Sequence, residues 1–391
     1  MSLEAVRPQC WQSTGSASVA PLGGAGTGLG GESCAGGLWE TGRTTLVSQG
    51  RWTGPIMALD PCRCVVTPVA SSSLPGIGVG TWAWGNQFLW GYSPAQDPEL
   101  EACFRRAVDL GLHFFDTADS YGTGSFNGRS ESLLGRFCAG LNEQQLRSLT
   151  VATKLAPFPW RLGRAGYDRA FAASQRRLGG KLDRVQLHWS TARYAPWQEQ
   201  PLLDGLAQLV RQGKVAELGV SNMGPVRLRQ VHQRLAERGV KLSSLQVQLS
   251  LLAPEAVAEG GVAAVCGELG IDLIAYSPLA LGLLARRPGP LGDVPAGPRG
   301  LLFRRLWQPV QPLLEALATI ADHHGIPPFA VALNWCRSHG AMPIVGLRTV
   351  AQAEAAATAV GFPLQDSERQ QLDQLARFST ARMPANPFQS R

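Results

Sequence analysis

The 391-residue sequence predicts an α/β fold, a (β/α)8 TIM barrel, on three observations. From about residue 74 onward, eight short apolar runs alternate with longer amphipathic stretches. Most of the runs are continuously apolar, as expected for parallel strands that are buried on both faces of a sheet. Glycines shortly precede several runs, where a helix C-terminus favours a left-handed residue, namely Gly111, Gly179, Gly213, Gly239 and Gly270.

The elements follow one another in the order that a barrel requires. The predicted strands cover residues 74–80, 113–116, 149–154, 185–188, 215–220, 244–247, 272–276 and 342–346. The predicted helices cover 98–110, 130–138, 167–178, 202–212, 225–238, 257–269, 310–339 with breaks, and 350–360. A Pro/Gly/Arg-rich stretch at 283–300 is predicted as a long loop, and 366–376 as a C-terminal helix with Asp366 as its N-cap. A doubly wound open sheet is the alternative, but the first strand leads into GTWAWG rather than a GxGxxG fingerprint.

The N-terminal part differs from the rest, so residues 1–62 are predicted as an unstructured, disordered extension and 63–391 as the barrel domain. The first sixty residues are rich in Gly, Ser and Thr, lack lysine and show no helix or strand period. Three interpretations stay open. The segment could be an organelle transit peptide, although its acidic residues Glu4, Glu32 and Glu40 count against this. It could be a disordered tail. It could also be translated upstream sequence, with Met57 as the true start.

Composition excludes several classes of partner. The net charge of +7 is spread over the chain without a Lys/Arg run long enough for a nucleic-acid patch. No apolar run approaches the ~20 residues of a membrane helix. The eight cysteines form no CxxC pair, and no Cys/His grouping has zinc spacing, so no metal site is expected. The expected partner is a small molecule.

Four reactive side chains are expected at the same barrel mouth, because the C-terminal ends of barrel strands face the active site. Asp116 ends the second predicted strand and Tyr121 follows in its loop, Lys154 ends the third strand and His188 ends the fourth. Each residue has a plain structural alternative: an ion pair for Asp116 and Lys154, a packed loop aromatic for Tyr121 and a core histidine for His188. Their coincidence on three consecutive strands favours catalysis.

This set suits carbonyl reduction, in which hydride goes to carbon and a proton to oxygen. A phenol with a pKa near 10 keeps its proton at neutral pH, and a nearby ammonium lowers that pKa. Lys154 would supply this charge to Tyr121, and Asp116 would hold Lys154 in place. His188 would donate a hydrogen bond to the substrate carbonyl.

These residues lie in motifs that resemble the aldo-keto reductase family: FFDTADSYG at 114–122, ATK at 152–154, LHW at 187–189, GVSN at 219–222 and AYSPL at 275–279. The resemblance covers about residue 76 to the C-terminus. It implies the barrel fold, catalysis by the four residues above, and NADPH/NADP+ as cofactor without a Rossmann domain. It also implies the cofactor-binding residues Ser221, Asn222, Gln246, Tyr276, Ser277, Leu279, Gly346, Arg348, Thr349 and Gln352, of which Tyr276 stacks on the nicotinamide and Arg348 binds the 2′-phosphate. Family members usually carry an asparagine near the position of Ala356.

Further stretches resemble the plastid branch of this family, which reduces pyridoxal to pyridoxine. They are GTWAWGNQ at 80–87, DSYGTG at 119–124, PWRL at 159–162, LHWSTA at 187–192 and GPRGLLF at 297–303. A flat aromatic aldehyde suits a barrel mouth lined by tryptophans, and the expected lining residues are Trp84, Trp90, Trp160 and Trp189. For each of these tryptophans, packing within the barrel is the alternative. The resemblance implies a chloroplast location, with the cytoplasm as alternative, and a monomer or weak homo-oligomer.

Three other functions are weighed against this one. The protein could reduce other aldehydes or ketones, or bind NADPH as a non-catalytic regulatory subunit. A Schiff-base lyase using Lys154 is the third, which the neighbouring Asp116 and Tyr121 disfavour.

Overall fold

The computed structural model describes residues 76–390. The extension predicted at 1–62, its interpretation as a transit peptide and the boundary at residue 63 lie outside the described residues.

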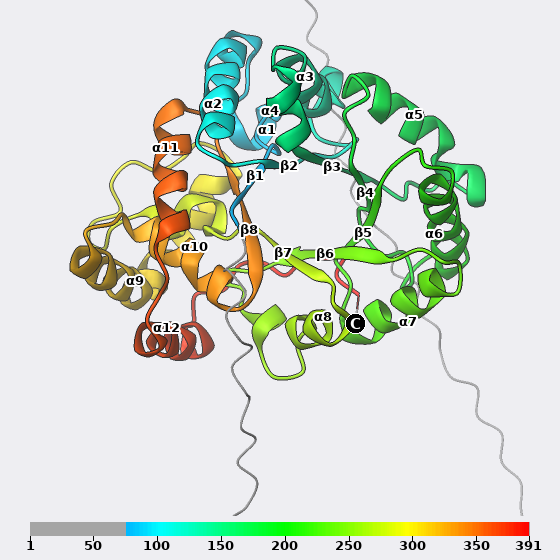
Figure 1. The fold of residues 1–391 in the computed structure, drawn as a ribbon. Coiled ribbons are helices and arrows are strands. Elements are labelled where there is room, and N and C mark those ends of the chain that lie inside the picture. Colours follow the sequence, from blue (N-terminus) through cyan, green and yellow to red (C-terminus); the bar gives the residue numbers. More distant parts are fainter. Residues whose placement is uncertain (1–75, 391) are drawn as a thin grey trace, which may run out of the picture. The chain divides into compact units, whose positions relative to one another are not determined.

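Eight parallel strands close into a barrel in sequence order, each paired with its neighbours and β1 paired with β8 (Figure 1). The strands are β1 (Gly78–Gly80), β2 (Phe114–Asp116), β3 (Thr150–Leu155), β4 (Arg184–Leu187), β5 (Glu217–Ser221), β6 (Leu242–Gln248), β7 (Asp272–Tyr276) and β8 (Ala341–Gly346). The predicted (β/α)8 barrel is therefore confirmed.

Helices form a ring outside the strands (Figure 1). Those that follow successive strands are α2 (Asp97–Asp109), α3 (Arg129–Cys138), α5 (Asp168–Arg177), α6 (Pro196–Arg211), α7 (Pro225–Ala236), α8 (Val262–Leu269), α9 (Pro298–His324) with α10 (Pro328–Ser338), and α11 (Val350–Thr358). Additional helices are α1 (Gln87–Trp90), α4 (Glu143–Ser148) and α12 (Asp366–Phe378). None of the helices in this part of the chain is long and apolar enough to cross a membrane.

The glycines predicted at helix ends adopt the left-handed conformation. Their φ angles lie between 62° and 82° at Gly111, Gly179, Gly213, Gly239 and Gly270. A residue with a Cβ atom is disfavoured there, so these glycines end the helices and turn the chain toward the next strand.

Two predicted boundaries are wrong around the C-terminal helices. Helix α9 begins at Pro298, inside the stretch predicted as loop, and continues through Pro309 and Pro312. Prolines normally break a helix, which hid this one from the sequence pattern. A buried stripe at Phe303, Leu306, Val310, Leu313, Leu317 and Ile320 runs past both prolines and holds the helix on the core.

The N-cap of α12 also differs from the prediction. Asp366 is the first helical residue, and Gln365 is the N-cap. The backbone N–H of Gln365 donates to Glu368 Oε2 at 2.9 Å, which is the carboxylate half of a capping box.

Candidate active site

A cavity of about 750 Å³ opens at the carboxyl ends of the strands. Each of the eight strands contributes a lining residue at or next to its last position: Gly80, Asp116, Lys154, His188, Ser221, Gln248, Tyr276 and Gly346. This end of a barrel carries the active site in enzymes of this architecture. The four predicted catalytic residues all line the cavity.

Lys154 and Asp116 form a buried ion pair at the cavity floor. Both side chains are 1% exposed. Lys154 Nζ donates to Asp116 Oδ2, to the carbonyl oxygen of Thr117 at 2.9 Å and to Tyr121 OH at 3.1 Å. The three donor protons of the ammonium are thus all used, and one of them reaches the phenol.

The second carboxylate oxygen of Asp116 is also occupied. Asp116 Oδ1 accepts from Gln246 Nε2 at 2.8 Å and from Gln186 Nε2 at 3.1 Å. A buried charge is tolerated when its partners satisfy it in this way. Gln186 was not predicted, although it lies two residues before His188 on β4 and so faces the same side of the strand.

The pKa of Tyr121 is raised above its ordinary value of 10. Burial raises it most; Lys154 lowers it, and Asp116 raises it further. Lys154 therefore acts in the predicted direction, but it does not make the phenol a stronger acid than free tyrosine before substrate is bound. Tyr121 keeps its proton at neutral pH.

His188 is neutral in this environment. Burial, followed by the positive charges of Lys154 and Arg161, holds its pKa well below 6.5. Its Nδ1 lies 3.3 Å from the hydroxyl oxygen of Ser120. When Ser120 donates to Nδ1, the single imidazole proton is on Nε2, and the ring can donate a hydrogen bond from there. The His188 and Tyr121 rings lie edge to face, 5.8 Å apart.

The residues predicted to hold the nicotinamide form one hydrogen-bonded group. Asn222 Nδ2 donates to the carbonyl oxygen of His188 and to Ser221 Oγ, both at 3.1 Å. Tyr276 OH donates to Asn222 Oδ1 at 2.9 Å. Asn222 and Ser277 have φ angles of 60° and 53°, an uncommon conformation for residues with side chains. Such strain often accompanies a functional site.

The C-terminal segment lies over this group. Asn386 Nδ2 donates to Tyr276 OH at 2.7 Å and to Asn222 Oδ1 at 2.9 Å. The N–H of Ser390 donates to the carbonyl oxygen of Asn222 at 3.0 Å, which anchors the segment at the mouth. Asn386 was not predicted, because the segment after 378 has no periodic pattern that would place it on the barrel.

The far end of the cavity is positively charged. Arg348 Nη1 donates to the carbonyl oxygen of Trp90 at 3.0 Å, and the Arg299 guanidinium lies 3.9 Å from the centre of the Trp90 ring. Burial, with the charges of Arg348 and Arg286, lowers the pKa of Arg299 to about 10. Within residues 76–390, Arg299 and Arg348 have no carboxylate partner. This end therefore favours an anion.

The other predicted cofactor residues divide into two groups. Ser277, Leu279, Gly346 and Gln352 line the cavity with those above, as does Ala356, where the family pattern would place an asparagine. Thr349 is not in the lining; it is the N-cap of α11, and its side chain accepts from the N–H of Gln352.

The predicted tryptophan lining needs correction. Trp90 lines the cavity. Trp84 does not: it is fully buried against Phe137, and its Nε1 donates to the carbonyl oxygen of Leu347 at 2.8 Å. Its packing between the barrel and α3 makes it a core residue.

Trp160 and Trp189 are also absent from the lining. Trp160 is 73% exposed and stacks on Phe158. Trp189 stacks on Phe388 of the C-terminal segment, with ring centres 4.6 Å apart, and contacts the His188 ring. Trp189 therefore lies beside His188 without lining the cavity.

Comparisons with known proteins agree with this architecture. The model of the aldo/keto reductase family matches residues 76–377. The chain is 46% identical over 325 residues to the chloroplastic pyridoxal reductase of Arabidopsis thaliana, covering 82% of this chain and 88% of that protein. It is 28% identical to methylglyoxal reductase of Escherichia coli, covering 77% of this chain and 90% of that protein.

Solved structures agree as well. An aldo/keto reductase from Klebsiella pneumoniae, solved with NADP and acetate, superposes with a TM-score of 0.61 at 26% identity, covering 80% of this chain and 95% of that one. The family model matches most of the chain, and the identity to the Arabidopsis protein extends over a similar length. The chain belongs to the aldo/keto reductase family.

Proposed function

We propose that the protein reduces aldehydes with NADPH as the hydride source, and that its substrate is pyridoxal, which it converts to pyridoxine. The chemistry rests above all on one observation: buried Lys154 contacts both Asp116 and the Tyr121 hydroxyl at the floor of the cavity. The choice of pyridoxal rests on the 46% identity to the Arabidopsis pyridoxal reductase.

The cavity fits an anionic dinucleotide. Trp90 Nε1 and Arg299 Nε are buried without a hydrogen-bond partner among the described residues, and both belong to the positively charged end of the cavity. Arg348 and Arg299 would hold the phosphates there. Ser221, Asn222 and Gln246 would hold the carboxamide at the other end. The bound cofactor would supply hydride to the carbonyl carbon of the substrate.

The protein's own residues would supply the proton. As negative charge develops on the carbonyl oxygen, Tyr121 donates its phenolic proton, because an alkoxide is a far stronger base than a phenolate. Lys154 stabilises the phenolate that is left, at the 3.1 Å contact seen here. Asp116 keeps Lys154 charged in a buried position.

His188 would orient the carbonyl. Its lowered pKa keeps it neutral at physiological pH, so it can donate a hydrogen bond without competing as a proton source. Trp189, which stacks on Phe388, packs against the His188 ring and would help to hold it in this orientation.

The experiment is NADPH oxidation followed at 340 nm with pyridoxal and a panel of aliphatic and sugar aldehydes. We expect Tyr121→Phe to lower turnover about 10²- to 10⁴-fold, the usual contribution of a general acid. Binding of NADPH, measured by fluorescence, should persist.

Tyr92→Phe is the matched control, since the Tyr92 hydroxyl is also hydrogen-bonded, to Asp97, but lies outside the cavity. Its turnover should stay near that of the wild type. Equal rates for Tyr121→Phe and wild type would remove Tyr121 as the acid. If the protein rapidly reduces other aldehydes but not pyridoxal, it is a general aldehyde reductase. If it binds NADPH without turnover of any aldehyde, it is a non-catalytic binding subunit.

The location and assembly of the protein are part of the proposal. The chloroplastic relative supports a plastid location, with residues 1–62 as the targeting segment. A fluorescent fusion of those residues that stays in the cytoplasm would contradict it. Sedimentation of the intact chain tests the expected monomer or weak homo-oligomer.

A further inference from the structure

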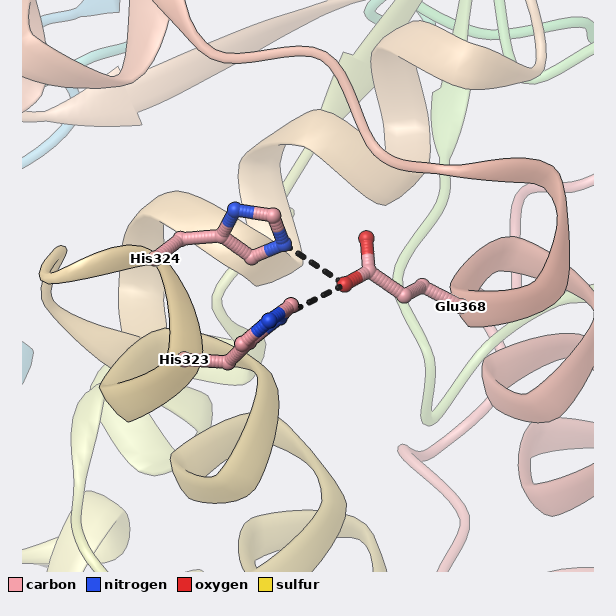
Figure 2. A group of neighbouring side chains, drawn as sticks. All are labelled: His323, His324 and Glu368. Carbon is pink, nitrogen blue, oxygen red and sulfur yellow. Dashed lines mark hydrogen bonds and ion pairs between the residues drawn. The ribbon is translucent and has the colours of Figure 1, made fainter.

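Two helix ends outside the active-site cavity bring together three side chains of types that bind metal ions (Figure 2). His323 and His324 are the last two residues of α9, and Glu368 is the third residue of α12. Each offers one ligand atom, and all three atoms lie within 4.8 Å of one another. The 43 residues between His324 and Glu368 explain why the spacing of Cys and His in the sequence predicted no such site.

Two of the three side chains are already held in place. Glu368 Oε1 accepts from His324 Nε2 at 2.6 Å, while Glu368 Oε2 accepts from the N–H of Gln365. The His324 ring packs against Phe362, with ring centres 4.6 Å apart. The bond from Gln365 orients the carboxylate in the way that neighbouring groups orient metal ligands in proteins. The bond between His324 and Glu368 joins two of the proposed ligands, and the ion would replace its proton.

The third side chain is free to adjust. The His323 side chain is 69% exposed, and its Nδ1 lies 3.8 Å from the same Glu368 oxygen. A metal ion with bonds of about 2.0 to 2.2 Å to nitrogen and oxygen would require a small movement of this exposed ring. It would also require His324 Nε2 and Glu368 Oε1, which are 2.6 Å apart, to separate slightly.

The local charge also favours a cation. The C-terminus of α9 carries the negative end of the helix dipole, and Glu368 adds a carboxylate. The nearby Arg287 pairs with Asp322 at 2.8 Å rather than with Glu368. Two imidazoles with one carboxylate suit Zn²⁺ and similar ions, whereas Ca²⁺ and Mg²⁺ prefer all-oxygen sites.

We propose that His323, His324 and Glu368 bind one divalent transition-metal ion such as Zn²⁺, which joins the end of α9 to the start of α12. The C-terminal segment that carries Asn386 leaves directly from α12. The ion would therefore also fasten the helix that precedes the cover of the active site.

The test is calorimetric titration of the untagged full-length protein with Zn²⁺, and separately with Mg²⁺. We expect one Zn²⁺ per chain and no uptake of Mg²⁺. His323→Ala and Glu368→Gln should each weaken Zn²⁺ binding by about 10- to 100-fold or more, the loss typical even for groups that only support a ligand. Binding should also weaken below neutral pH, because the ligands must lose their protons.

His113→Ala is the matched control, because His113 is an exposed histidine outside the cluster. It should bind Zn²⁺ as the wild type does. Hydrogen exchange gives a second measurement that needs no variant: Zn²⁺ should slow exchange in α12. No Zn²⁺ uptake, or equal affinity in the wild type, His323→Ala and Glu368→Gln, would overturn the proposal.

Discussion

Asp116→Asn tests whether the buried ion pair holds the active site together. The substitution keeps the shape of the side chain and an oxygen that can accept from Gln246, but it removes the charge opposite Lys154. Because both side chains are 1% exposed, Lys154 would be left as an unpaired buried ammonium. Breaking such a pair costs about 3 to 5 kcal/mol.

The pH dependence of the loss identifies its cause. In the wild type, burial lowers the pKa of Lys154, but Asp116 and Tyr121 outweigh it, so the net pKa is raised above 10.5. The stabilisation from charged Lys154 is therefore present at neutral pH and is lost only as pH rises through that raised pKa. In the variant, burial acts without Asp116 and lowers the pKa below that of the unfolded chain. The free energy of unfolding of the variant should then increase as pH rises from neutral toward about 10.

The assay is urea unfolding of both proteins between pH 7 and 9.5, read by circular dichroism. Glu143→Gln is the matched control, since its pair with Arg147 is exposed, and it should cost about 1 kcal/mol or less. The reasoning is refuted if Asp116→Asn loses less than about 1 kcal/mol, or if its stability changes with pH as that of the wild type does.

Three further predictions concern the cavity. Because the pKa of His188 is held well below 6.5, folding stability should fall as pH drops below about 6.5. In acid unfolding curves, His188→Asn should make that fall less steep. If the loss of stability in acid is unchanged in the variant, His188 is not a buried neutral histidine. Asn386→Ala removes two hydrogen bonds, to Tyr276 and Asn222, each worth about 1 kcal/mol. NADPH should therefore dissociate roughly 5- to 30-fold faster from the variant, as measured by stopped flow. An unchanged dissociation rate would mean that the C-terminal segment does not cover the cofactor. Arg348→Ala should weaken NADPH binding roughly 10- to 150-fold and leave NADH binding unchanged, measured by fluorescence titration; equal losses for both would place the 2′-phosphate elsewhere.

The local sequence pattern was sufficient to predict the barrel and the end of it at which the reactive side chains lie. Apolar runs alternating with helical stretches predicted eight strands in order, and the structure has them in that order. Parallel strands bring their carboxyl ends to one edge, so Asp116, Lys154 and His188 could be placed together from the sequence alone.

Packing between distant segments decided the rest. Trp84 and Trp90 stand six residues apart with the same side chain, yet one is a core residue and the other lines the cavity, because only Trp84 has α3 packed over it. Asn386 reaches Tyr276 across a separation of 110 residues, and no local period encodes such a contact.

The acidity of Tyr121 shows the same division. The residue type and its lysine partner could be identified from the sequence, and so could the direction in which Lys154 acts. The balance depends on how much water the phenol loses, and burial outweighs the ammonium. The sequence by itself thus determined which groups meet, whereas the dielectric surroundings in which they meet are set by the whole fold.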